Sequence, residues 1–256
     1  ELLSYQNGSA GINWQNEIFR TGITQNYKLT VSNGSEKTQY YISANYMRQE
    51  GVVIKSKNER YSAKMNLSSR LTDWLHITAD INASHGIRYG GSFASSKDNP
   101  IWIALNYSPT MTMMSENGNY NTDIYNSIAS NPVGILRLQS GEAMTNVFNG
   151  RVDLRFNIVK GLTFITTNGV DYYDGKSYSF SSKRVGTKSV MGNNDTYRLM
   201  LQSSNNLTYT GSWNDHHLTA TVVYEVTSSE TRTIGITGNN LLTEGVGWWN
   251  VGMASS

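Results

Sequence analysis

The stretch Gln25–Ser69, which reads QNYKLTVSNGSEKTQYYISANYMRQEGVVIKSKNERYSAKMNLSS, decides the fold of this chain. Apolar and polar residues alternate along three runs of it, so that every second side chain is apolar. A period of two with one apolar face is the pattern of a half-buried β-strand. Asn33-Gly34 stands between the first two runs, and Asn-Gly between alternating runs is a strong hairpin signal. The stretch therefore predicts strand, short turn, strand, longer loop, strand.

The same alternation returns along the rest of the chain and predicts about eight strands between residues 25 and 226. Loop segments are expected at 1–24 and 227–256, and the longest connection is expected at 86–145. The connections alternate in length along the chain. Short turns are expected around Gly34, Thr72, Lys160 and Ser212, and long loops around Lys55 and from Gly86, Gly175 and Ser228.

Composition narrows the protein class. Hydrophobic residues make up 38% of the 256 residues, and no run approaches the roughly 18 apolar residues that a spanning helix needs. A spanning strand needs only about 9–11 residues, so membrane residence through strands stays open. The net charge of +2 gives no support for a nucleic-acid partner, and the absence of cysteine excludes disulfides and thiolate sites.

Two all-β architectures fit the alternation. Short turns at one end and long loops at the other are typical of an antiparallel transmembrane β-barrel with periplasmic turns and extracellular loops. Aromatic residues at strand ends, such as Tyr27, Tyr46 and Trp74, agree with this, because amphipathic rings are stable at membrane interfaces. A soluble β-sandwich with one wet face per sheet gives the same alternation. Strand length and the loop alternation favour the barrel.

Candidate functional residues fall into two groups. Charged residues on the polar strand faces would line the lumen. Aromatic residues in the long loops would either stack on sugar rings or peptide side chains or, as is more frequent for each residue, pack the loops against each other. The lumen-lining candidates are Lys64, Asp80, Arg151, Asp153 and Arg155. The substrate-binding candidates are Trp102, Tyr107, Tyr120, Tyr125, Tyr178, Phe180, Trp248 and Trp249.

Enzymatic motifs are missing from the sequence. None of the nucleophile-elbow, zinc-protease, phosphate-loop or dinucleotide fingerprints occurs. His216 and His217 are adjacent on a predicted strand and point to opposite faces, so they cannot share one metal. We expect no catalytic residue, no metal and no cofactor.

The ordered set of segments resembles the SusC/RagA family, the TonB-dependent outer-membrane transporters of Bacteroidetes. The resemblance rests on Gln25–Tyr41 with Gln49–Val53, on the preceding Trp14–Gly22, and on Asn131-Pro132, Lys160-Gly161-Leu162 and Asn206–Tyr209 further along. It implies that the chain is an early part of a barrel of about 22 strands whose plug domain and remaining strands lie outside this sequence. It also implies import of an oligosaccharide or peptide with a SusD-like surface lipoprotein and with TonB.

A second function class is a surface adhesin or a soluble glycan-binding β-domain, which needs no lipid-facing band. The two classes differ in what covers the apolar face. Burial of Ile81, Leu154 and Phe156 against a second β-layer of this chain would exclude the transporter.

Overall fold

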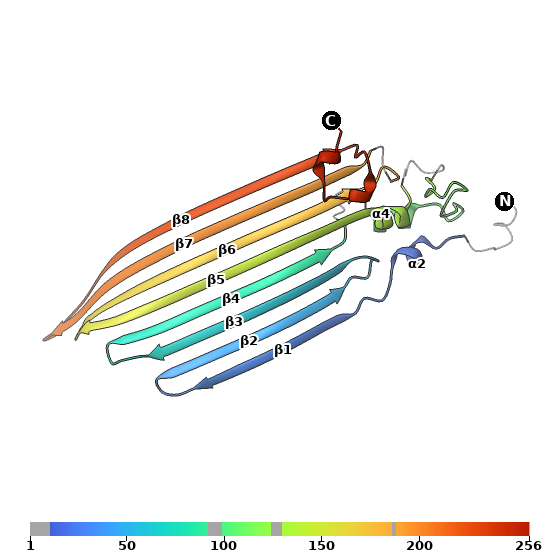
Figure 1. Cartoon of the computed structure of the whole chain (residues 1–256). Coiled ribbons are helices and arrows are strands. Elements are labelled where there is room, and N and C mark those ends of the chain that lie inside the picture. The colour runs from blue at the N-terminus through green and yellow to red at the C-terminus, as the bar shows by residue number, and fades with distance from the viewer. Residues whose placement is uncertain (1–10, 92–98, 124–129, 186–187, 256) are drawn as a thin grey trace.

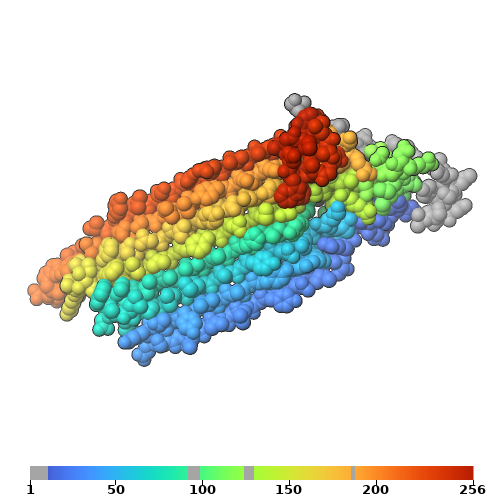
Figure 2. Space-filling model, in the orientation of Figure 1, coloured from blue at the N-terminus to red at the C-terminus, as the bar shows by residue number. Residues whose placement is uncertain are grey.

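The computed structural model describes residues 11–91, 99–123, 130–185 and 188–255. Most of these form one antiparallel sheet of eight strands in chain order (Figure 1), and the space-filling view in Figure 2 shows the strands side by side. Each strand pairs with the next one along the chain. The strands are β1 (Thr24–Gly34), β2 (Thr38–Glu50), β3 (Lys57–Arg70), β4 (Leu75–Tyr89), β5 (Gln139–Val159), β6 (Leu162–Ser181), β7 (Val190–Trp213) and β8 (His216–Asn239).

The helices are short and belong to the connections. They are α2 (Trp14–Ile18), α3 (Pro100–Asn106), α4 (Pro132–Leu138) and the 3-10 turns η1 (Glu244–Val246) and η2 (Val251–Met253). An asparagine caps each α-helix, because the side chains of Asn13, Asn99 and Asn131 accept hydrogen bonds from first-turn amides. No helix in the described part of the chain is long and apolar enough to cross a membrane.

Register places the apolar residues of neighbouring strands on one face, because directly opposed residues of an antiparallel pair point to the same side. One such row runs from β1 to β5, with each residue opposite the next. Its members are Leu29, Ala44, Ala63, Ala83 and Phe148. The parallel row below it reads Val31, Ile42, Met65, Ile81 and Gly150. These two rows are therefore apolar, glycine included, from β1 to β5, whereas Thr166, Asn168, Ser203 and Asn205 interrupt the same face on β6 and β7.

Aromatic rings border this apolar face on two levels. Tyr46 stacks on Tyr27 and contacts Tyr61 toward the loop end, with ring centroids 6.4 and 4.8 Å apart. Phe156 lies 6.1 Å from Trp74 and 6.0 Å from Phe164 toward the turn end. Two aromatic levels separated by an apolar band match the girdles of a membrane-spanning barrel wall.

No second layer covers the apolar face in the part of the chain that the structure describes. Ile81, Leu154 and Phe156 all remain partly exposed, and Leu29 and Val222 at the two sides of the sheet are 70% and 69% exposed. A sandwich would bury these residues. The barrel-segment fold expected from the sequence is confirmed, and the sandwich is excluded for these residues.

The connections differ at the two ends of the sheet. Turns at 35–37, 71–74, 160–161 and 214–215 lie at one end, and the longer segments 51–56, 90–138, 182–189 and 240–255 lie at the other. Figure 1 shows α2, α4 and the C-terminal turns together at the second end. This end, called the loop end below, corresponds to the expected long-loop side.

The strands extend further into the loop end than expected from the sequence. Residues 227–239 belong to β8 and not to a loop, residues 175–181 and 190–195 belong to β6 and β7, and residues 139–145 belong to β5. The pattern was weak here because only short apolar pairs, Tyr178 with Phe180 on β6 and Ile234 with Ile236 on β8, alternate with polar residues while the backbone ladder continues. The strand β8 has 24 residues and is about 80 Å long. A strand needs only about 9–11 residues to cross a bilayer, so β8 extends well beyond it.

The two outer strands, β1 and β8, lie at the edges of the sheet. β1 is exposed along its whole length, and β8 is exposed from His216 to Thr237. Each pairs on one side only within this sheet. Both sheet edges are therefore open to further strands.

Candidate functional site

The polar face of the sheet brings the predicted lumen-lining residues together. Asp80 lies opposite Arg151, and the register places Lys64, Asp153 and Arg155 on the same face. Nε of Arg151 donates to Oδ1 of Asp153 at 3.0 Å, and the Asn66 amide donates to Asp80. Arg151 and Asp153 thus form an ion pair on this face, whereas Asp80 accepts from a neutral amide.

The turn-end half of this face contains a hollow of about 540 Å³ with mixed charge. Arg151 and Arg155 line it together with Asp153. His76 of the same hollow shares a hydrogen bond of 3.2 Å with the Ser68 hydroxyl. The hollow therefore offers groups of both charges to anything that contacts this part of the wall.

The loop-end half of the polar face contains two adjoining hollows of about 570 and 510 Å³, called the cationic trough below. They share Arg60, Ser84 and Val147, and their cations on this face are Lys28, Arg60, Lys64 and Arg88. Only Lys64 was among the sequence candidates. The other three could have been found from the alternation of strand faces. Arg60, for example, directly precedes Tyr61, whose side chain is on the apolar face, so Arg60 is on the polar face.

Tyr173 forms one border of the cationic trough. A Cβ atom at Gly175 would lie 2.5 Å from the Tyr173 hydroxyl, so the tyrosine can fold over position 175 only because that residue is glycine. The Arg198 guanidinium lies 5.9 Å from the centre of the Tyr173 ring, within cation–π range. An aromatic face and an additional cation thus adjoin the trough.

The loop aromatics divide into packing and exposed residues. Tyr107 is 4% exposed, meets Trp14 edge to face at 4.8 Å, and donates its hydroxyl proton to the Asn121 carbonyl at 2.5 Å. Burial raises the pKa of Tyr107 to about 12. Tyr107 therefore packs the loops and does not present its ring to a ligand.

Two further loop aromatics are placed at different depths. Tyr120 packs on Gly134, where an added Cβ would lie 2.8 Å from its ring, while Trp102 on α3 is partly exposed. Tyr125 lies outside the described residues. Of the two that the structure describes, Trp102 has the exposed ring.

Three of the remaining candidates form one aromatic cluster. The Tyr178 ring stacks 6.3 Å from Trp248 and 6.2 Å from Trp249, and the two tryptophans lie 6.1 Å apart. Tyr178 and Phe180 point to the same side of β6 as the apolar-face Tyr172, since successive even positions share a face. These rings therefore lie on the side of the wall opposite the cationic trough.

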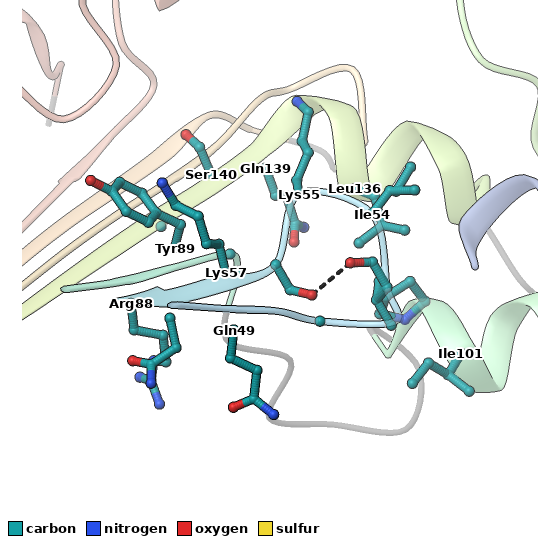
Figure 3. Close-up of a pocket in the computed structure, with 18 of the residues that line it drawn as sticks. Gln49, Ile54, Lys55, Lys57, Arg88, Tyr89, Ile101, Leu136, Gln139 and Ser140 are labelled. Atoms are coloured by element: carbon teal, nitrogen blue, oxygen red, sulfur yellow. Dashed lines mark hydrogen bonds between the residues drawn. The ribbon is translucent and has the colours of Figure 1, made fainter. Parts of the chain in front are cut away.

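A pocket of about 610 Å³ opens at the loop end (Figure 3). Ile54, Ile101 and Leu136 supply apolar lining, and the Lys55 ammonium donates to the Arg137 carbonyl at 3.0 Å. Figure 3 shows Lys57 beside Tyr89, with the ammonium 4.4 Å from the ring centre, while Arg88 points to the other side of the strands. The pocket can accept an apolar group beside a hydrogen-bonding or anionic one.

The described residues contain no group of three or more His, Asp or Glu side chains that could hold a metal ion. The histidines bond to neighbouring polar groups instead. His85 shares a hydrogen bond of 2.7 Å with Asn146, and His217 shares one of 2.8 Å with Ser212. The polar face therefore offers charged and hydrogen-bonding groups for noncovalent binding.

Comparison with curated proteins finds TonB-dependent receptors. The chain is 25% identical over 224 residues to TonB-dependent receptor P3 of Formosa agariphila, covering 84% of this chain and 22% of that protein. It is 25% identical over 206 residues to TonB-dependent receptor SusC of Bacteroides thetaiotaomicron, covering 70% of this chain and 20% of that protein. The chain thus spans about a fifth of the length of these relatives. No family model matches it.

Solved structures show the same fold. The RagAB peptide transporter aligns with all of this chain and 30% of its own chain, at a TM-score of 0.73 and 18% identity. The RagAB peptide importer in its closed-closed state aligns equally far, at 0.74 and 19%. These findings confirm the resemblance predicted from the sequence: the chain is similar in sequence to TonB-dependent receptors, SusC among them, and its sheet has the fold of part of the RagAB transporter.

Proposed function

We propose that this SusC/RagA-like barrel segment forms part of the wall of a TonB-dependent importer, which takes up an oligosaccharide or peptide with a SusD-like surface lipoprotein. The observation that carries the proposal is the apolar face of β1 to β5, which no second layer covers in the described residues. Such a face is stable only in contact with hydrocarbon, where every backbone group must also be paired. The import function is inferred from the similar proteins, which are a TonB-dependent receptor and a peptide transporter.

Each part of the segment has a place in this function. The strands from β1 to β8 form the wall, the turns between them face the periplasm, and the loop end faces outward. The polar face provides the route for the substrate, and the exposed Trp102 on α3 offers a ring at the loop end. TonB would act on a plug domain elsewhere in the full-length protein.

The alternative of a surface adhesin is less well supported. An adhesin domain exposes its binding face on a self-contained fold, whereas this sheet has two open edges. Open edges in lipid must be closed by further strands. A barrel wall meets that requirement, and a separate adhesin domain does not.

The proposal is tested with the full-length protein in its native outer membrane. Unheated and boiled samples should migrate differently on a denaturing gel, as intact barrels do, and deletion of its gene or of TonB should abolish growth on the imported nutrient. Peptide and glycan growth media separate the two substrate classes. Recovery in the soluble fraction, with migration that heating does not change, would refute the importer.

A further inference from the structure

The cationic trough contains no carboxylate. Neither of its two hollows is lined by Asp or Glu, although Lys28, Arg60, Lys64 and Arg88 all line them. None of these four residues belongs to an ion pair among the described residues. Arg60 and Arg88 are exposed at neighbouring positions of β3 and β4, so their guanidinium groups face water.

Carboxylates on the polar face are confined to the turn-end half, where Arg151 and Arg155 also lie. The carboxylates of this face are Asp80, Asp153, Asp171 and Glu225, and all lie level with Asn82 or nearer the turn end. Carboxylates of the loop-end half, such as Glu59 and Glu142, point to the opposite face. The Glu59 carboxylate there pairs with the Lys57 ammonium at 3.3 Å. A substrate entering from the loop end therefore meets positive charge first.

Unpaired guanidinium groups in a concave wall are suited to bind anions. Arginine binds carboxylate or sulfate oxygens through two parallel N–H donors, and a hollow lined by one sign of charge concentrates counter-ions. Around the cations the polar face carries hydroxyl and amide groups, including Asn45, Ser62, Ser84 and Thr145. Such groups match sugar hydroxyls, whereas peptide side chains need apolar pockets as well.

We propose that the cationic trough binds the carboxylate or sulfate groups of an acidic oligosaccharide as it enters the barrel. This inference rests on the proposed importer function and narrows its substrate class. Arg60 and Arg88 hold the anion, Lys28 and Lys64 extend the positive surface toward the turn end, and Tyr173 offers a ring face to a sugar.

The experiment uses the full-length transporter and a pool of oligosaccharides made by partial hydrolysis of a uronate-rich, a sulfated and a neutral polysaccharide. Retained species are identified by mass spectrometry. The wild type should retain acidic species preferentially. The double variant Arg60→Gln/Arg88→Gln should retain at least about tenfold less of them, since each lost contact is a charge-assisted hydrogen bond. Arg232→Gln is the matched control, because Arg232 is on the opposite face and pairs with Glu230.

The outcomes separate this inference from the importer function. Preferential retention of neutral species, or equal retention of acidic species by the double variant, overturns the trough while import of an oligosaccharide stands. If the transporter retains nothing from the pool, the proposal that the trough binds acidic oligosaccharides is also overturned. The importer function is still tested separately by the gel-migration and TonB-deletion experiments. A parallel pool of peptides rich in Asp and Glu is the last arm, and retention of these peptides alone would overturn the assignment to a sugar.

Discussion

Ile81 and Asn82 are neighbours in the sequence but lie on opposite faces of β4. Ile81 joins the apolar row between Met65 and Gly150, and Asn82 lies between Lys64 and Asn149 on the polar face. Ile81→Arg should destabilise the full-length barrel by about 2–4 kcal/mol, the cost of a cation near the bilayer midplane. Asn82→Arg should have a much smaller effect, because its side chain remains in water. Urea unfolding in lipid vesicles measures both, and equal costs would contradict the assignment of faces.

Gly161 and Asn214 have left-handed backbone conformations in two turns of the same end, with φ of 84° and 49°. A Cβ atom at Gly161 would lie 2.3 Å from the Thr210 carbonyl oxygen, whereas asparagine tolerates its conformation at 214. Gly161→Ala should therefore cost about 1–3 kcal/mol, and Asn214→Gly should change stability little. The same unfolding measurement tests both, and a neutral Gly161→Ala would show that the turn relaxes.

The stability of the folded loops should depend on alkaline pH because of Tyr107. Its pKa is raised to about 12 by burial, above the usual value of about 10. The folded loops hold this proton where the unfolded chain loses it, so the stabilisation is complete below pH 10 and is lost as pH rises through 12. The near-ultraviolet absorbance difference between wild type and Tyr107→Phe should titrate near pH 12. A midpoint near 10 would show that the ring is accessible.

At the scale of elements, α2, α3 and α4 form a small core at the loop end. Trp14 is 2% exposed, donates from Nε1 to the Ser108 carbonyl at 2.9 Å, and packs in a cluster with Ile103 and Val133. Trp14→Ala should cost this cluster about 3–5 kcal/mol and leave the barrel folded. Trypsin added to intact cells should then cleave faster at Arg137. Trp102→Ala, on the exposed side of α3, is the control and should not change the cleavage rate.

Some features of the strands and loops could be predicted from the sequence and others could not. Faces, turns and strand order were predictable wherever a strand crosses the apolar band, because one face there must be apolar. The loop-end parts of β5 to β8 were not, since only short apolar pairs such as Ile234 with Ile236 mark a strand there. The loop core was missed for another reason: Trp14, Ile103 and Val133 come from distant segments, and only the folded chain brings them together.

Candidate site residues were predictable to the same extent. Asp80, Arg151 and their neighbours were placed on the polar face because parity in a strand is strict. The roles of loop aromatics were not predictable, because a loop sequence does not show which side of a ring is covered. Tyr107 is buried, and Trp248 packs on Tyr178 at the outer side of the wall.

At the scale of the whole molecule, the two open edges determine how the segment behaves alone. Both β1 and β8 carry a row of backbone groups without partners in this sheet. Residues 1–256 expressed alone and refolded in detergent should therefore aggregate and lack heat-modifiable migration. The full-length protein under the same conditions should migrate as an intact barrel. A stable, heat-modifiable monomer of the segment would show that the sheet closes on itself.

The register of this sheet also restricts how the gene can change in length. An odd number of residues inserted within β4 would exchange the two faces of everything on one side of the insertion, placing Ile81 in water or Asp80 in lipid. Only even insertions keep each side chain in its solvent. The single register shift among the described strands, between Asn157 and Val159, lies beside a turn, beyond the last aromatic pair. Natural length variation should thus accumulate at the loop end, and where it enters the wall it should come in steps of two.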